Sequence, residues 1–92
     1  MTDKIVRQLK IVNEKGLHAR AAAKLVEVVE GFDATAEVSQ NGQYTGADSI
    51  MGLLMLAASK GTTIDVQISG PDAVALADAV EALVADRFGE DM

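Results

Sequence analysis

Residues 63–71 read Thr-Ile-Asp-Val-Gln-Ile-Ser-Gly-Pro, the clearest strand signal in the chain. Ile64, Val66 and Ile68 alternate with polar residues, which predicts a strand with one buried face and one solvated face. Sheets with a solvated face are usually antiparallel. Helices packed against the other face would complete an α+β sandwich of two layers.

Helical patterns lie on both sides of this strand. Before it, Ser49 offers an N-cap to a helix that starts at Ile50 and is predicted to end at Gly61. After it, Gly70-Pro71 is predicted to open the last helix, with proline in the first turn. The acidic segment after Arg87 is expected to fray. The predicted buried stripe of the last helix consists of Ala73, Leu76, Ala77, Val80, Leu83 and Val84.

The first half of the chain supplies the remaining elements. Residues 5–12 predict a strand, and the apolar stripe within residues 19–30 predicts an amphipathic helix that stops at Gly31. Residues 34–39 alternate weakly, and Asn41-Gly42 favours a tight hairpin that returns through residues 43–45. The predicted order is β-α-β-β-α-β-α. This is an α+β open-faced sandwich, with a four-stranded antiparallel sheet covered on one face by three helices.

Composition limits the class of protein. The 92 residues, 49% of them hydrophobic, suit one domain spanning 1–92. Without cysteine, and with one histidine, no disulfide framework, multi-histidine zinc site or other metal site is expected. A net charge of -6 and an aromatic content of 3% argue against nucleic-acid binding. The apolar run at 50–58 is too short to span a membrane, and the first residues lack a signal-peptide pattern, so we expect a cytoplasmic protein without membrane insertion.

The charge is distributed unevenly along the chain. The first 24 residues carry six basic and two acidic side chains, whereas the remaining residues carry two basic and twelve acidic ones. An acidic body with a basic N-terminal quarter predicts that this quarter contacts something negative.

The histidine lies in that basic quarter, within Gly16-Leu17-His18-Ala19-Arg20. It precedes a predicted helix, whose N-terminus presents unpaired N–H groups and stabilises an anion. The same positive end disfavours imidazolium, and Arg20 could hold a phosphoryl group through charge-assisted hydrogen bonds. A solvated cap residue is the simpler interpretation. Because no nucleotide-binding loop accompanies the histidine, the chain is expected to carry a group rather than catalyse its transfer.

The segment Gly-Leu-His-Ala-Arg followed by Ala-Ala-Lys-Leu-Val resembles the active-site segment of HPr. HPr proteins are the histidine-containing phosphocarriers of the bacterial phosphoenolpyruvate-dependent phosphotransferase system. The resemblance continues through residues 48–54, 60–62 and 70–72, in order and with matching spacing. The predicted order of elements is also that of the HPr fold, so the resemblance covers nearly the whole chain.

The resemblance implies specific roles. His18 would carry the phosphoryl group on Nδ1, and Arg20 would stabilise it. Enzyme I would supply the group and an enzyme IIA-type protein would receive it, without a cofactor. Ser49 matches the serine that an HPr kinase/phosphorylase modifies in some bacteria. A monomer is expected, and either the sugar-uptake branch or a regulatory nitrogen-linked branch is possible.

Three positions depart from the family pattern. Ala21 replaces a proline that usually follows the motif arginine, which could loosen the turn but should leave the helix intact. Lys15 adds charge where a small polar residue is common. Asp48 stands before Ser49 where several relatives have lysine, so recognition by the kinase is in question.

The docking surface for these partners is predicted beside His18. Its expected members are Leu17, Ala19, Lys24, Ile50, Met51 and Leu54. The apolar members are expected to be exposed, although a methionine at helical spacing, such as Met51, is also typical of a core. Enzyme I and the acceptor should compete for this surface, because one histidine must reach both.

Ser49 permits other interpretations. It could be only an N-cap. The segment Gly46-Ala47-Asp48-Ser49-Ile50 also resembles the phosphopantetheine attachment site of acyl carrier proteins, but those are all-helical and would not explain the hairpin and strand signals or His18. A non-catalytic regulatory interaction domain is the third possibility.

Overall fold

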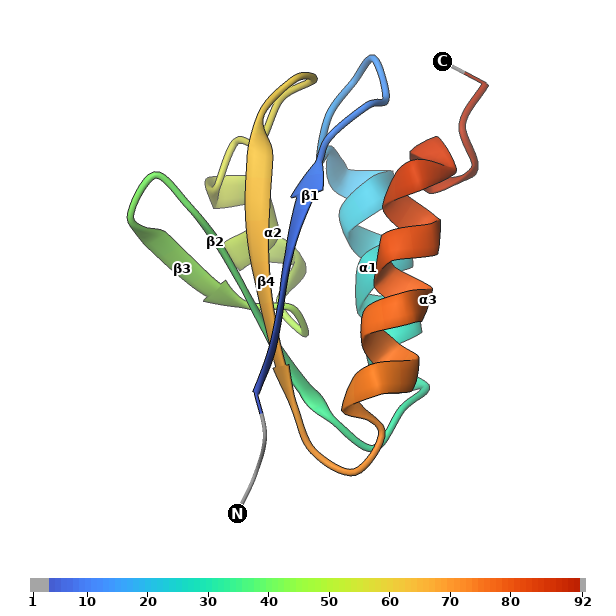
Figure 1. Ribbon diagram of the computed structural model, residues 1–92. Helices are drawn as coiled ribbons and strands as arrows, with labels where there is room; N and C mark the ends of the chain where they lie inside the picture. The colour runs from blue at the N-terminus through green and yellow to red at the C-terminus, as the bar shows by residue number, and fades with distance from the viewer. Residues whose placement is uncertain (1–3, 92) are drawn as a thin grey trace.

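The computed structural model describes residues 4–91 and contains one four-stranded sheet with helices packed on it (Figure 1). All neighbouring strands are antiparallel, in the order β1-β4-β2-β3. The predicted α+β class and element order are therefore confirmed. The elements are β1 (Ile5–Lys10), α1 (Ala19–Glu30), β2 (Thr35–Gln40), β3 (Gln43–Gly46), α2 (Ile50–Met55), β4 (Thr63–Ser69), α3 (Ala73–Ala85) and a 3-10 turn, η1 (Arg87–Gly89).

The strand with the clearest alternation lies inside the sheet. β4 pairs with β1 on one side and β2 on the other, and its Ile64, Val66 and Ile68 are almost completely buried under the helices. The residues between them are half-buried on the opposite face. One face of the sheet is thus covered and the other meets solvent, as the alternation predicted.

β1 ends at Lys10 rather than Val12, although Ile11 still exchanges backbone bonds with the loop before β4. Arg7 interrupts its apolar face for a specific reason. Its guanidinium lies 2.7 Å from Glu81 and 3.4 Å from Asp78, both on α3. These ion pairs connect β1 to α3 at the edge of the helical layer.

α1 begins and ends as predicted. Gly31 forms its C-cap, and its apolar stripe packs against the sheet with Leu25 completely buried. Figure 1 shows α1 and α3 side by side over one face of the sheet. Within residues 4–91, no helix is long and apolar enough to cross a bilayer.

The predicted end of α2 at Gly61 is wrong. The helix ends at Met55, and Ala57 adopts a left-handed conformation with φ of 54°. This turn directs Ala58 inward, where its carbonyl accepts a hydrogen bond from the Leu17 N–H at 2.8 Å. A tertiary contact therefore stops the helix before its apolar pattern does.

Two predictions about the C-terminal region are also wrong. Pro71 precedes the helix instead of lying in its first turn, since α3 starts at Ala73 and Asp72 is its N-cap residue. Asp72 accepts a hydrogen bond from the Asp33 backbone at 2.8 Å, which ties the start of α3 to the loop after α1. The segment after Arg87 is folded, because Phe88 is completely buried. In the predicted buried stripe, Leu83 is only partly buried.

Candidate functional site

His18 is the N-cap residue of α1. Its backbone is extended, and its Nδ1 accepts a hydrogen bond from the Arg20 backbone N–H at 3.3 Å. The ring therefore stands at the positive end of the helix, with Nδ1 directed toward the N-terminal amides. Its side chain is 27% exposed, so a partner can reach it.

The loop before His18 fixes where the ring projects. Gly16 has φ of 66°, and a Cβ at this position would lie 2.5 Å from the Ala58 carbonyl oxygen. A side chain here would therefore meet both an unfavourable backbone conformation and a clash with fixed backbone. Leu17 next to it is only 4% exposed, so its predicted exposure is wrong. Its backbone N–H donates a hydrogen bond to the Ala58 carbonyl, and its side chain packs in the core.

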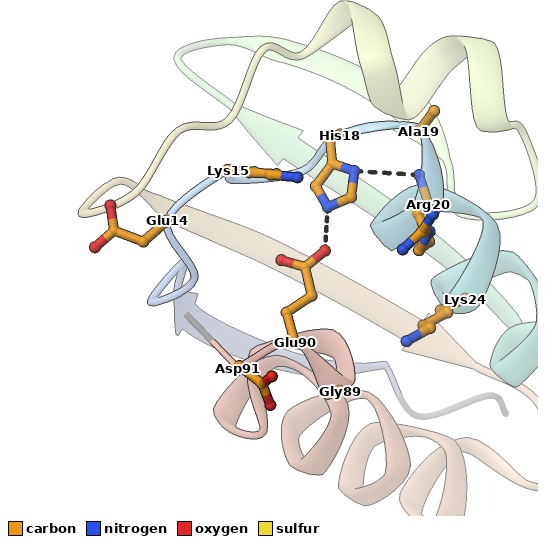
Figure 2. A pocket seen from close by; sticks show the side chains of 9 residues that line it. All are labelled: Glu14, Lys15, His18, Ala19, Arg20, Lys24, Gly89, Glu90 and Asp91. Carbon is orange, nitrogen blue, oxygen red and sulfur yellow. Dashed lines mark hydrogen bonds and ion pairs between the residues drawn. The ribbon is translucent and has the colours of Figure 1, made fainter.

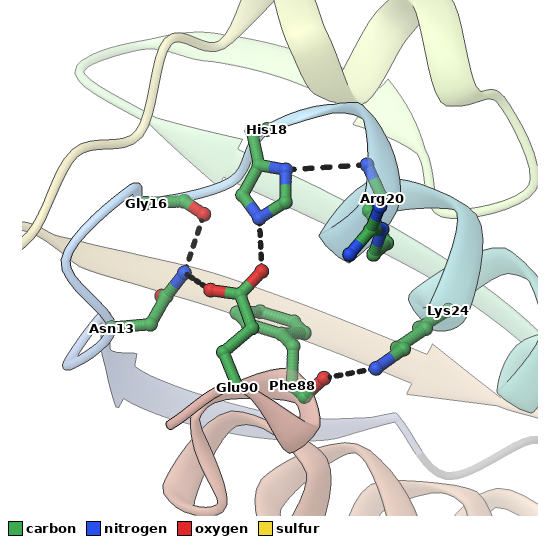
Figure 3. Close-up of polar contacts among 7 residues, drawn as sticks. All are labelled: Asn13, Gly16, His18, Arg20, Lys24, Phe88 and Glu90. Carbon is green, nitrogen blue, oxygen red and sulfur yellow. Dashed lines mark hydrogen bonds and ion pairs between the residues drawn. The ribbon is translucent and has the colours of Figure 1, made fainter. Parts of the chain in front are cut away.

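The other ring nitrogen contacts the C-terminal segment. Figure 3 shows the Glu90 carboxylate below the imidazole, with one oxygen bonded to His18 Nε2. The second oxygen accepts a hydrogen bond of 2.9 Å from Asn13 Nδ2, which also donates to the Gly16 carbonyl at 2.8 Å. Asn13 is completely buried. Its two hydrogen bonds connect the loop before α1 to the C-terminal segment.

These contacts favour the ionised form of Glu90. The Asn13 hydrogen bond lowers the pKa of this carboxyl below its ordinary value, against the opposing effect of burial, and His18 and Lys15 lower it further. Because the pKa is lower in the folded protein, the carboxylate stabilises the fold at pH values above its unfolded pKa. This contribution is lost as the pH falls through the folded pKa.

The segment that carries Glu90 is anchored at Phe88. The Phe88 ring is completely buried, and its carbonyl accepts a 2.6 Å hydrogen bond from Lys24 Nζ on α1. Arg87 and Phe88 both have positive φ, near 55°, a conformation that costs about 1–2 kcal/mol for each residue with a side chain. Burial of the ring and the Lys24 bond maintain this backbone, which turns the chain back toward His18.

An open pocket of about 710 Å³ lies between the start of α1 and this segment (Figure 2). Its basic side chains come from α1 and the loop before it, whereas its acidic ones come both from that loop, at Glu14, and from the C-terminal segment, at Glu90 and Asp91. The guanidinium of Arg20 forms no ion pair within residues 4–91, and Arg20 is exposed. The lining residues are Glu14, Lys15, His18, Ala19, Arg20, Lys24, Gly89, Glu90 and Asp91.

The predicted docking residues have different exposures. Ala19 is exposed beside His18, and Lys24 is half-buried with its ammonium directed to Phe88. On α2, Ile50 is 40% exposed and Met51 70% exposed, so Met51 is a surface residue rather than part of the core. Leu54 is half-buried.

Ser49 caps α2. Its Oγ accepts a hydrogen bond from the Gly52 N–H at 3.0 Å, which is the N-cap geometry that the sequence predicted. Ser49 is half-buried and precedes the exposed Ile50 and Met51.

Two residues of the site were missed at the level of sequence. Asn13 and Glu90 lie 77 positions apart, and neither belongs to the motif around His18. One signal pointed to the C-terminal contribution: Phe88 is a large apolar residue in an otherwise acidic segment. Within residues 4–91 there is no group of three or more histidine, cysteine, aspartate or glutamate residues that could hold a metal ion.

Comparison with known proteins identifies relatives along almost the whole chain. The sequence model of a family described as "PTS HPr component phosphorylation site" matches residues 5–86. Phosphocarrier protein HPr of Cupriavidus necator is 46% identical over 84 residues, which cover 91% of this chain and 94% of that protein. Phosphocarrier protein NPr of Shewanella violacea is 45% identical over 87 residues, covering 95% and 96%.

A solved structure of an HPr protein has the same fold along almost the whole chain. The crystal structure of HPr-C-His from Thermoanaerobacter tengcongensis has a TM-score of 0.90 and 31% sequence identity. The match covers 96% of this chain and 99% of that one. An acyl carrier protein, which is all-helical, does not fit this fold.

Proposed function

Because this chain belongs to the HPr family of phosphocarriers of the phosphotransferase system, we propose that His18 is the residue that carries the phosphoryl group. Members of this family carry the group between other proteins and are not themselves the catalyst. Their partners are proteins of the phosphotransferase system such as enzyme I and IIA-type proteins. Relatives named HPr and relatives named NPr both align with the chain, so either branch of the system is compatible with these matches.

The position of Nδ1 carries this proposal. Nδ1 accepts a hydrogen bond from the Arg20 N–H at the start of α1. Its lone pair therefore lies where an incoming anion would also meet the N-terminal amides of the helix. The Nδ1 lone pair attacks the phosphorus of a phosphohistidine on enzyme I, forming one P–N bond as the donor's P–N bond breaks. The donor imidazole leaves with the electron pair. The Arg20 guanidinium and the N-terminal amides of α1 then bind the phosphoryl oxygens.

The proposal is tested by identifying the atom that carries the phosphoryl group. Protein phosphorylated through enzyme I from phosphoenolpyruvate is expected to gain the mass of one phosphoryl group. In protein with ¹⁵N-labelled histidine, coupling to ³¹P should appear at Nδ1. Coupling at Nε2, or phosphate attached to another residue, would contradict the proposed geometry.

We propose that partners dock on the surface formed by Ala19, Lys24, Ile50, Met51 and Leu54. The exposed apolar side chains of α2 supply contact area, and the basic residues around the pocket favour an acidic partner surface. The same surface would serve enzyme I and the IIA-type acceptor in turn. The protein would act as a monomer in the cytoplasm.

Ser49 is proposed as a regulatory phosphorylation site for an HPr kinase/phosphorylase. A phosphate would add a charge of about -1.5 to -2 beside the apolar docking residues. The helix terminus tolerates this charge, whereas an acidic partner surface would be repelled.

Replacing Ser49 with aspartate is expected to reduce phosphoryl acceptance from enzyme I by about tenfold, which corresponds to ~1.4 kcal/mol of weakened association. Aspartate is itself a good N-cap, so α2 should persist. Initial rates at several concentrations of the phosphocarrier would show the effect mainly in KM. Ser49→Asn, which caps the helix without the charge, should behave like the wild type. Equal rates for Ser49→Asp and Ser49→Asn would refute regulation by charge at this position.

A further inference from the structure

We infer that Glu90 is a positioning residue for His18: by accepting the Nε2–H, its carboxylate leaves the lone pair on Nδ1, the atom that must attack phosphorus. This inference rests on the proposed role of His18. It extends that role to a residue outside the stretch matched by the family model, which ends at residue 86.

The hydrogen bonds at the two ring nitrogens agree on one tautomer. Nδ1 accepts from the Arg20 N–H, so it must bear the lone pair. Nε2 contacts the Glu90 carboxylate, an acceptor, so it must bear the proton. A neutral imidazole satisfies both contacts only as the Nε2–H tautomer.

Asn13 fixes the orientation of the carboxylate. Its amide nitrogen has two hydrogens, one bonded to the Gly16 carbonyl and the other to Glu90. Both Glu90 oxygens therefore act as acceptors, one for Asn13 and one for His18. The lowered pKa of Glu90 is consistent with an acceptor that stays ionised.

The backbone that presents Glu90 is also specialised. Two residues with side chains, Arg87 and Phe88, adopt left-handed conformations just before Gly89, which precedes Glu90. The Lys24–Phe88 hydrogen bond and the buried ring hold this turn against α1. Strained backbone of this kind persists where surrounding contacts fix it, often at functional sites.

The carboxylate also assists the reacting ring. When Nδ1 forms the P–N bond, the ring becomes an imidazolium that retains its proton on Nε2. No proton needs to move, and the positive charge faces the Glu90 carboxylate. A carboxylate beside a catalytic histidine acts in this way elsewhere, by holding the tautomer and stabilising the cation.

The decisive variant is Glu90→Gln. A glutamine amide has one oxygen and one NH₂ group, so it cannot accept from Asn13 and His18 at once. If its NH₂ faces Asn13, two donors oppose each other; if it faces His18, it favours the tautomer with the proton on Nδ1. Asp86→Asn removes the same charge from an exposed residue outside the pocket and serves as the control.

Two measurements are made on each full-length protein. The ¹⁵N chemical shifts of the His18 ring are expected to show Nε2–H in the wild type and in Asp86→Asn, and a shift toward Nδ1–H in Glu90→Gln. The rate of phosphoryl acceptance from enzyme I should fall about tenfold in Glu90→Gln, the lower end of the roughly 10–100-fold losses seen when carboxylates that orient metal-ligating histidines are mutated. The loss should lie in kcat, with KM for the phosphocarrier unchanged.

An unchanged tautomer in folded Glu90→Gln, or an unchanged kcat, would overturn the inference. A loss confined to KM would also overturn it, since that would assign Glu90 to partner docking. These outcomes differ from failure of the proposed function, in which the wild-type protein itself would not be labelled on His18. The ring tautomer can be measured without any partner.

Discussion

Replacing His18 with alanine is expected to abolish labelling from phosphoenolpyruvate through enzyme I, leaving a signal indistinguishable from background. No second histidine in the chain can take its place. The variant loses the Nδ1 acceptor for the Arg20 N–H, an N-cap contribution of roughly 1 kcal/mol. It should therefore remain folded, which far-ultraviolet circular dichroism and thermal unfolding would check. Intact mass after incubation measures the incorporated phosphoryl group.

His18→Asn separates chemistry from folding. Asparagine is a preferred N-cap and can accept the Arg20 N–H, but its side-chain amide cannot form a phosphoimidazole. This variant should recover the N-cap contribution that His18→Ala loses and still remain unlabelled. If either variant relays phosphate to a IIA-type protein at the wild-type rate, His18 is not the carrier residue.

Replacing Phe88 with alanine is expected to lower the free energy of unfolding by about 3–5 kcal/mol, the usual cost of removing a fully buried aromatic ring. The effect would be large because the ring is completely buried, in a segment that packs against α1 and α3. The same change releases the turn that holds Glu90 beneath His18. Urea unfolding followed by circular dichroism measures the stability.

The other phenylalanine offers a matched comparison. Phe32 follows α1 and is only partly buried at the edge of the core, so Phe32→Ala should cost less. Its removal should also leave the His18 ring tautomer unchanged, whereas Phe88→Ala should alter it under conditions where the protein stays folded. A loss below that of Phe32→Ala would mean that the C-terminal segment is not packed as described.

The sequence predicted elements most accurately where local pattern and local stop signals agree. The bounds of α1 and of β4 follow from an apolar stripe ended by Gly31 and from the alternation of residues 63–69. His18 and Arg20 could be assigned to one site because a helix N-terminus and two neighbouring residues suffice to place them. Their roles rest on the proposal above.

The features that could not be predicted depend on contacts between distant segments. α2 stops at Met55 because Ala58 meets Leu17, a contact that no periodicity encodes. The acidic composition of the segment around Phe88 predicts fraying, yet its ring is buried. Nothing local signals that Arg87 and Phe88 would turn left-handed and return Glu90 to the start of α1.

The pairing of His18 with Glu90 has a consequence for biosynthesis. The two residues are 72 positions apart, so a nascent chain that has exposed its histidine motif still lacks the carboxylate beneath the ring. β1 likewise cannot form its hydrogen bonds in the sheet until β4, its neighbour, has been synthesised. A fragment ending before Glu90 would display the recognisable motif without the contact at Nε2. Synthesis of Glu90 is therefore the step that makes this contact possible.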